Sequence, residues 1–145
     1  MPHPSVARRY ARFVLGLALE QVPPPVAAKA TSLALDTLGS CLASSREEFG
    51  RAVLEAAERL GGAPETTLIG TKARAGAASA VLANATLAHG LDFDDTREDA
   101  IVHTGCVAVT TALAVGEALG ASGRAVLEAM IAGVEVMCRV GLAVP

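Results

Sequence analysis

The chain has 145 residues, of which 52% are hydrophobic and 3% aromatic, and a formal net charge of −3. These values fit one globular domain over residues 1–145 and exclude an intrinsically disordered chain. The sequence has no basic stripe, which argues against a nucleic-acid partner. Its three cysteines form no CxxC pair, so we expect buried, reduced thiols and a cytoplasmic protein.

The first half of the chain predicts three helices. Ser5 is placed to cap the first helix, and the prolines at 23–25 separate it from a second helix that begins at Pro25. A capping box over residues 45–48 predicts the start of the third helix, which ends at Gly61. The second helix is expected to turn inward Ala27, Ala30, Ala34, Leu38 and Leu42, and the third Phe49, Val53, Ala56 and Leu60.

The second half predicts a short extended piece over residues 66–69 and three more helices. A helix over about 75–89 is apolar nearly all round, so we expect it at the centre of the molecule. Helices over about 105–119 and 123–142 follow, the last one capped by Ser122. The fold class is therefore all-α, a bundle of about six helices. No stretch is suited to span a membrane, and no membrane partner is expected.

One stretch departs from this aliphatic background: LAHGLDFDDTREDAIVHTG, residues 87–105. It places five carboxylates between His89 and His103. A solvated loop is the ordinary interpretation of such a run. However, the first aspartates alternate with Leu91 and Phe93, which we expect to be buried. Coupled titratable groups near a core favour a functional site.

Metal chemistry fits the stretch poorly. Counting from Asp92, an EF-hand would need Gly at Arg97 and a carboxylate at His103. The run from Asp94 to Glu98 resembles the DDxxD/E magnesium motif of helical prenyl-diphosphate enzymes, but a second acidic motif and an aromatic pocket are missing. We therefore expect no metal and no cofactor.

The remaining candidate for this stretch is acid–base chemistry without a metal. A histidine exchanges protons near neutral pH, and a neighbouring carboxylate orients it. Thr96 is suited to donate a hydrogen bond to a substrate oxygen. His103 immediately precedes the predicted helix at 105, whose free amides would attract a substrate carboxylate. Such a set suits proton transfer on a small polycarboxylic acid.

Two segments carry a resemblance to a known family. AVLANATLAHGLDFDDT, followed by a histidine seven residues after Thr96, and ALAVGEALGASGRAVLEAMIAGVEVMCRVG resemble the N-terminal half of the MmgE/PrpD helical domain. ATSLALDTLGSCLA resembles its second helix. The family includes 2-methylcitrate dehydratase, cis-aconitate decarboxylase and iminodisuccinate epimerase.

The resemblance implies a cofactor-independent lyase or isomerase of di- or tricarboxylic acids. Asp92, Thr96 and His103 match the family's active-site positions. Asp92 would orient or polarise, Thr96 would bind substrate and His103 would transfer the proton. The same motif suggests substrate contacts or a supporting role for three further residues, His89, Asp94 and Asp95. Where the family usually has Pro after the second histidine, this chain has Thr104.

The resemblance also bears on domain organisation. Family enzymes are several times longer and usually dimeric, with an α/β lid domain and further catalytic histidine and lysine residues. We therefore expect part of the helical domain, without the lid. It would act as a fragment or subunit that forms a homodimer or associates with a missing C-terminal half. The alternative is a non-catalytic helical oligomerisation module left by truncation.

Overall fold

The computed structural model describes residues 5–144, and helices make up most of this part of the chain. A single 3-10 turn, η1 (Leu19–Gln21), separates the first two helices, and a small antiparallel pair of strands pairs Thr66 with Ala75. The predicted all-α fold is confirmed. The elements are α1 (Val6–Gly16), α2 (Pro24–Ser44), α3 (Glu48–Leu60), β1 (Thr66–Thr67), β2 (Arg74–Ala75), α4 (Ala77–His89), α5 (Gly105–Ala118) and α6 (Gly123–Leu142).

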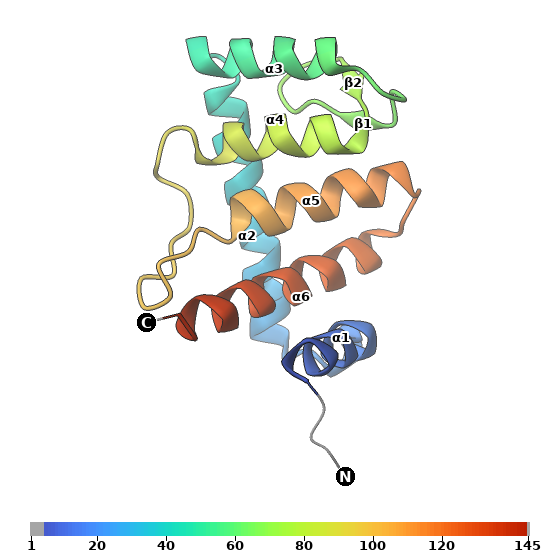
Figure 1. Ribbon diagram of the computed structural model, residues 1–145, viewed down its shortest axis with the longest axis vertical. Coiled ribbons are helices and arrows are strands. Elements are labelled where there is room, and N and C mark those ends of the chain that lie inside the picture. Colours follow the sequence, from blue (N-terminus) through green and yellow to red (C-terminus); the bar gives the residue numbers. More distant parts are fainter. Residues whose placement is uncertain (1–4, 145) are drawn as a thin grey trace.

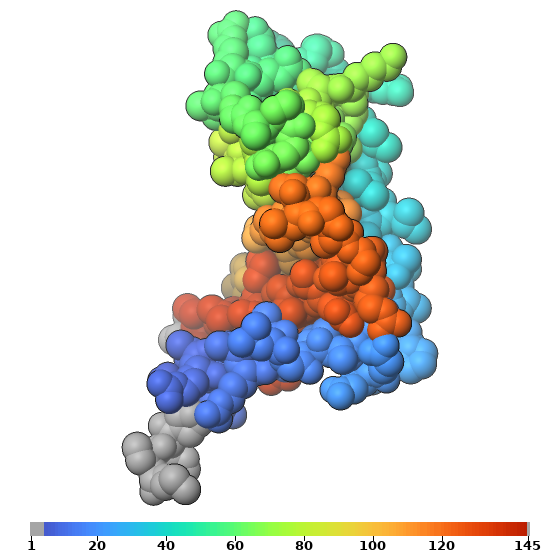
Figure 2. All heavy atoms as spheres, turned by 90° about the vertical axis from the view of Figure 1, so that its right-hand side faces the viewer, coloured from blue at the N-terminus to red at the C-terminus, as the bar shows by residue number. Residues whose placement is uncertain are grey.

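The helices form a layer with one long helix across it. Helices α3, α4, α5 and α6 lie side by side in that order, and α1 packs beside α6 (Figure 1). Helix α2 crosses this layer and contacts α4, α5 and α6. In the space-filling view α2 lies along one edge of an elongated molecule (Figure 2). Helix α2 therefore lies across one face of the layer.

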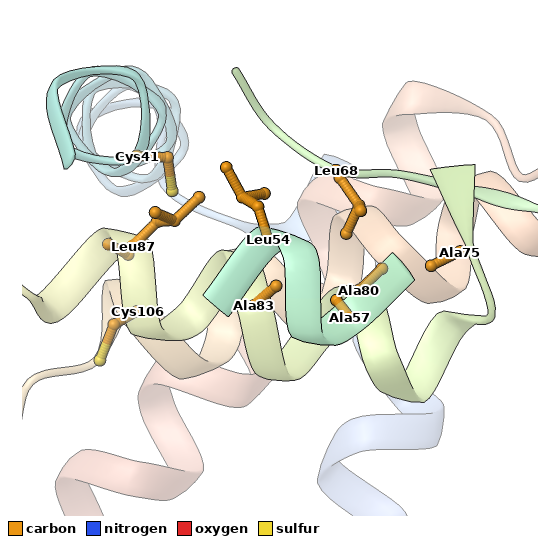
Figure 3. Packing of buried hydrophobic residues seen from close by; sticks show 10 residues of the cluster. Cys41, Leu54, Ala57, Leu68, Ala75, Ala80, Ala83, Leu87 and Cys106 are labelled. Atoms are coloured by element: carbon orange, nitrogen blue, oxygen red, sulfur yellow. The ribbon is translucent and has the colours of Figure 1, made fainter. Parts of the chain in front are cut away.

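The core is made of small side chains. Ala80 and Ala83 of α4 are completely buried, and they belong to the same buried cluster as Leu54 and Ala57 of α3 (Figure 3). Small residues let the helix axes approach closely, so packing can be dense without aromatic rings. The expected central position of α4 is only partly realised, because Leu82 on its outer side is 57% exposed.

Several helix ends agree with the sequence. The Ser5 hydroxyl accepts a hydrogen bond from the Arg8 amide, and the Ser122 hydroxyl accepts one from the Ala125 amide. The capping box over residues 45–48 is wrong. The Ser45 hydroxyl instead donates to the Leu42 carbonyl at the end of α2, and α3 begins after Glu47.

The predicted inward face of α3 is wrong by one residue. Its buried residues are Gly50, Leu54 and Ala57, whereas Leu60 is exposed. The reason is a close approach between α3 and the end of α2. A Cβ atom at position 50 would collide with the Ser44 carbonyl, so glycine is the only residue type that permits this packing. Because Gly50 has no side chain, α3 is rotated so that Gly50, and not Phe49, faces the end of α2.

The predicted inward side of α2 is half-buried from Ala27 to Leu38, but the most deeply buried residues of the helix lie beside it. Leu42 is exposed, and the buried residues are Thr37, Ser40, Cys41 and Ser44. Their small polar groups are compatible with burial where they bond locally, as the Thr37 hydroxyl does by donating to the Leu33 carbonyl. Helix α2 begins at Pro24, one residue before the predicted start.

The strand pair is fixed to the helices by polar side chains. The Asn84 side chain accepts from the Ile69 amide at 3.0 Å and donates to the Thr67 carbonyl at 3.0 Å. The Glu117 carboxylate accepts from the Thr67 amide and hydroxyl and pairs with Arg74. These bonds join the hairpin to α4 and α5. Within residues 5–144, no helix has the length and apolarity needed to cross a bilayer.

Candidate functional site

The acidic stretch forms the connection between α4 and α5, residues 90–104. It descends from the end of α4 and passes the C-terminal end of α6 (Figure 1). The backbone of Ala100 lies so close to Gly141 of α6 that no Cβ fits there. Asp92 has a positive φ of 55°, a conformation that aspartate tolerates better than most residues. The loop therefore packs against the helical bundle at the end of α6.

Asp94 is the centre of the site. Its carboxylate is only 2% exposed, and one of its oxygens, Oδ1, lies 3.0 Å from His89 Nδ1 and 3.3 Å from His103 Nδ1. The two imidazole rings meet edge to face with their centres 4.6 Å apart. A buried carboxylate thus bridges two histidines that are 14 positions apart in the chain.

Asp92 and Thr96 lie at the margin of this pair. One potential ligand atom from each of Asp92, Asp94, His89 and His103 falls within 4.8 Å of the others. The Thr96 hydroxyl is 3.5 Å from His103 Nδ1. Asp92 and Thr96 are both exposed, so they face solvent beside the histidines. Five of the six predicted site residues are brought together.

The Asp95 side chain does not face the histidines but points towards the start of α5. One of its oxygens accepts from the Gly105 amide at 2.7 Å, and the other accepts from the Thr104 amide and hydroxyl. The expectation that these amides would receive a substrate carboxylate is corrected, because a carboxylate of the chain itself occupies this end of α5. Asp95 thereby holds the residue after His103 in place.

The packing of the loop also bears on one expectation, a buried Phe93, and on the magnesium motif that the sequence disfavours. Phe93 is 63% exposed, so the prediction that it is buried is wrong. The magnesium motif from Asp94 to Glu98 does not converge, because Asp94 faces the histidines and Asp95 caps α5. Asp99 is exposed, and its pKa is lowered by a hydrogen bond from Arg97. The part of the loop from Arg97 to Asp99 is therefore exposed to solvent.

The thiols near the site are not activated. Burial, reinforced by the neighbouring Asp94 carboxylate, raises the pKa of Cys106 to about 11. Burial raises the pKa of Cys41 to about 12. Both thiols therefore stay protonated at neutral pH, and nucleophilic thiolate chemistry is not favoured here.

Comparison with known proteins decides the family. The family model described as the MmgE/PrpD N-terminal domain matches residues 8–145. The chain belongs to the MmgE/PrpD family. No curated protein and no solved structure matches it significantly. The MmgE/PrpD match covers the helices and the whole acidic loop, so the site described above lies within the family's N-terminal domain.

Two features of this candidate site in the MmgE/PrpD domain differ from the sequence-based expectations. The central position of Asp94 was missed, since it was expected only to support the other residues. The bonds of Asp95 to Thr104 and Gly105 were also missed, because no local pattern links residues nine and ten positions apart. The one available signal was Gly105, whose lack of a side chain leaves room for the Asp95 carboxylate.

Proposed function

We propose that His89 and the loop 90–104 form the acid–base part of an active site for a di- or tricarboxylic acid. The reaction would be that of a cofactor-independent lyase or isomerase, similar to 2-methylcitrate dehydratase of propionate metabolism. The observation that supports this proposal is the buried carboxylate of Asp94 between His89 and His103. Family membership supports the reaction class.

The geometry suggests how the histidines would work. An ionised carboxylate only accepts hydrogen bonds, so each Nδ1 that faces Asp94 carries a proton. In a neutral imidazole the other nitrogen, Nε2, then holds the lone pair. Asp94 would thus fix the tautomer of both rings and leave His89 Nε2 and His103 Nε2 for the substrate.

A dehydration needs two proton transfers. A base removes a proton from the carbon next to a carboxylate, and an acid protonates the departing hydroxyl, so that a double bond forms and water leaves. His103 would act in this proton transfer, as the base or as the acid. Asp92 would orient or polarise the substrate, and Thr96 would donate a hydrogen bond to a substrate oxygen. Asp95 would act through the position of His103, since its carboxylate is bonded to α5.

The substrate carboxylates also need cationic partners. Arg97, the basic residue of the loop, is already paired with Asp99. We therefore propose that the cations come from a second domain or chain closing over the loop, which would also exclude water and strengthen the electrostatics. A cytoplasmic location, with the cysteines kept reduced, is part of the same proposal.

The test is binding at the two imidazoles. Citrate, cis-aconitate and 2-methylcitrate are titrated into the chain in complex with the second domain or chain that supplies the cations, while the imidazole NMR signals of His89 and His103 are followed. The proposal expects a saturable shift of both signals with at least one acid, and a much weaker response in Asp94→Asn. Glu98→Gln, in the same loop, is the matched control. Unchanged signals with all three acids would refute the proposal.

A second function is favoured by a separate observation. A groove of about 540 Å³ runs between α5 and α6 and is lined almost entirely by aliphatic side chains, among them Val107, Val115 and Leu119. None of the six candidate site residues lines it. This surface would suit a non-catalytic helical oligomerisation module, for which the loop would be an inherited feature.

A further inference from the structure

The histidine and aspartate cluster also offers the donor set of a metal site. It combines two imidazole nitrogens with two carboxylates, and the four atoms lie within 4.8 Å of one another. Two carboxylate charges balance a divalent cation. Magnesium and calcium prefer oxygen ligands alone, whereas mixed nitrogen and oxygen donors suit zinc, cobalt or iron.

The distances fit a small ion. Donor atoms around tetrahedral zinc lie about 3.3 Å apart when the bonds are about 2.0 to 2.1 Å long. The separations from Asp94 Oδ1 to the two Nδ1 atoms are 3.0 and 3.3 Å. The Asp92 carboxylate is exposed, and one of its oxygens lies within 4.8 Å of the other three donor atoms, so a side-chain movement would bring it in as the fourth ligand.

We propose that His89, Asp92, Asp94 and His103 form a binding site for one divalent transition-metal ion of the zinc type. The ion would replace the protons that the two Nδ1 atoms share with Asp94. The inference departs from the expected metal-free site and does not rest on the proposed function, because it concerns binding alone.

The experiment is calorimetric titration of the whole chain with Zn²⁺, with Mg²⁺ as the comparison ion. We expect one Zn²⁺ per chain and no Mg²⁺ heat. His89→Gln, His103→Gln and Asp94→Asn should each weaken Zn²⁺ binding by about 100-fold or more, since even the loss of an outer-shell partner costs about 10- to 100-fold. Circular dichroism establishes that each variant keeps its helices.

Two control variants and a second probe make the result specific. Glu98→Gln changes a carboxylate of the same loop, and His3→Gln removes the third histidine of the sequence; both should bind Zn²⁺ as the unaltered chain does. Co²⁺ should give a tetrahedral-type spectrum without a thiolate charge-transfer band. Absence of Zn²⁺ binding, undiminished binding in the histidine variants, or a thiolate band would each overturn the proposal.

Discussion

At the scale of single residues, the three aspartates at positions 92, 94 and 95 of the loop have different roles. Asp94 is buried between two histidines, Asp95 caps a helix, and Asp92 remains exposed beside them. Because the three side chains are chemically identical, the sequence does not show which of them has which role. It arises because consecutive residues of an irregular loop point in different directions, and each carboxylate bonds to the partner that it meets.

Asp94 is expected to control the imidazole tautomers. In Asp94→Asn the amide offers both a donor and an acceptor, so the proton is no longer held on Nδ1 of His89 and His103. ¹⁵N NMR of the imidazoles at pH 8 should show the Nδ1–H form in the unaltered chain and a mixture in the variant. Turnover of the assembled enzyme should fall by about 100-fold. Unchanged ¹⁵N shifts would contradict this role.

Asp95 is expected to matter for stability. Asp95→Ala leaves the Thr104 and Gly105 amides without their acceptor, and the free energy of unfolding should fall by about 2 kcal/mol. Urea denaturation measures the change. Glu98→Ala, an exposed carboxylate of the same loop, should stay within about 0.5 kcal/mol of the unaltered chain. Equal effects of the two substitutions would show that Asp95 does not act as a cap.

At the scale of secondary-structure elements, contact distance between helices decides which faces are buried. The hydrophobic pattern of α3 favours an inward Phe49, but the close approach at Gly50 turns the helix by one position. The hairpin is similarly placed by side chains of α4 and α5 rather than by its own two short strands. Both effects depend on a neighbour that the local pattern does not contain.

Two glycines test the packing of α2 against α3. A methyl group at Gly50 would meet the Ser44 carbonyl, so Gly50→Ala should lower the free energy of unfolding by about 1 to 3 kcal/mol. Gly39 is exposed in the middle of α2 with open space around it, so Gly39→Ala should raise this free energy by about 0.5 to 1 kcal/mol. Chemical denaturation of both variants gives the comparison. The same sign for both would contradict the packing described.

The link between Glu117 and the hairpin predicts a pH dependence of stability. Burial alone would raise the pKa of Glu117, but hydrogen bonds from Thr67 and Arg74 outweigh it and hold the pKa below 4.5. The stabilisation is therefore complete above pH 4.5 and is lost as the pH falls through the lower, folded-state pKa. Thermal unfolding between pH 6 and pH 3 should decline less steeply in Glu117→Gln. An identical slope would show that this carboxylate is not involved.

At the scale of the whole molecule, the bundle covers one face and leaves another apolar. Helix α2 packs across α4, α5 and α6 and buries Val109 and Met130. On other sides of α5 and α6, the groove that contains Val107 and Val115 has no covering helix among residues 5–144. Exposed aliphatic surface of this kind marks an interface.

The groove predicts self-association. We expect light scattering at micromolar concentration to give a dimer or a higher oligomer, because burial of the aliphatic groove is favourable. Val115→Asp should shift the chain towards monomer, whereas Leu35→Asp, on an exposed part of α2, should not. A clean monomer for the unaltered chain, or an equal effect of both substitutions, would refute this interface.

The sequence by itself determined the helical fold class, the order of the helices and most of their ends, because periodicity, prolines and serine caps act over a few residues. The histidine and aspartate spacing also predicted most of the loop residues that come together, and the family match agrees with the resemblance. Only the tertiary structure decided the rotation of α3, the buried stripe of α2 and the separate tasks of Asp94 and Asp95. These depend on which atoms from distant segments come within bonding distance, and a local pattern carries no information about that.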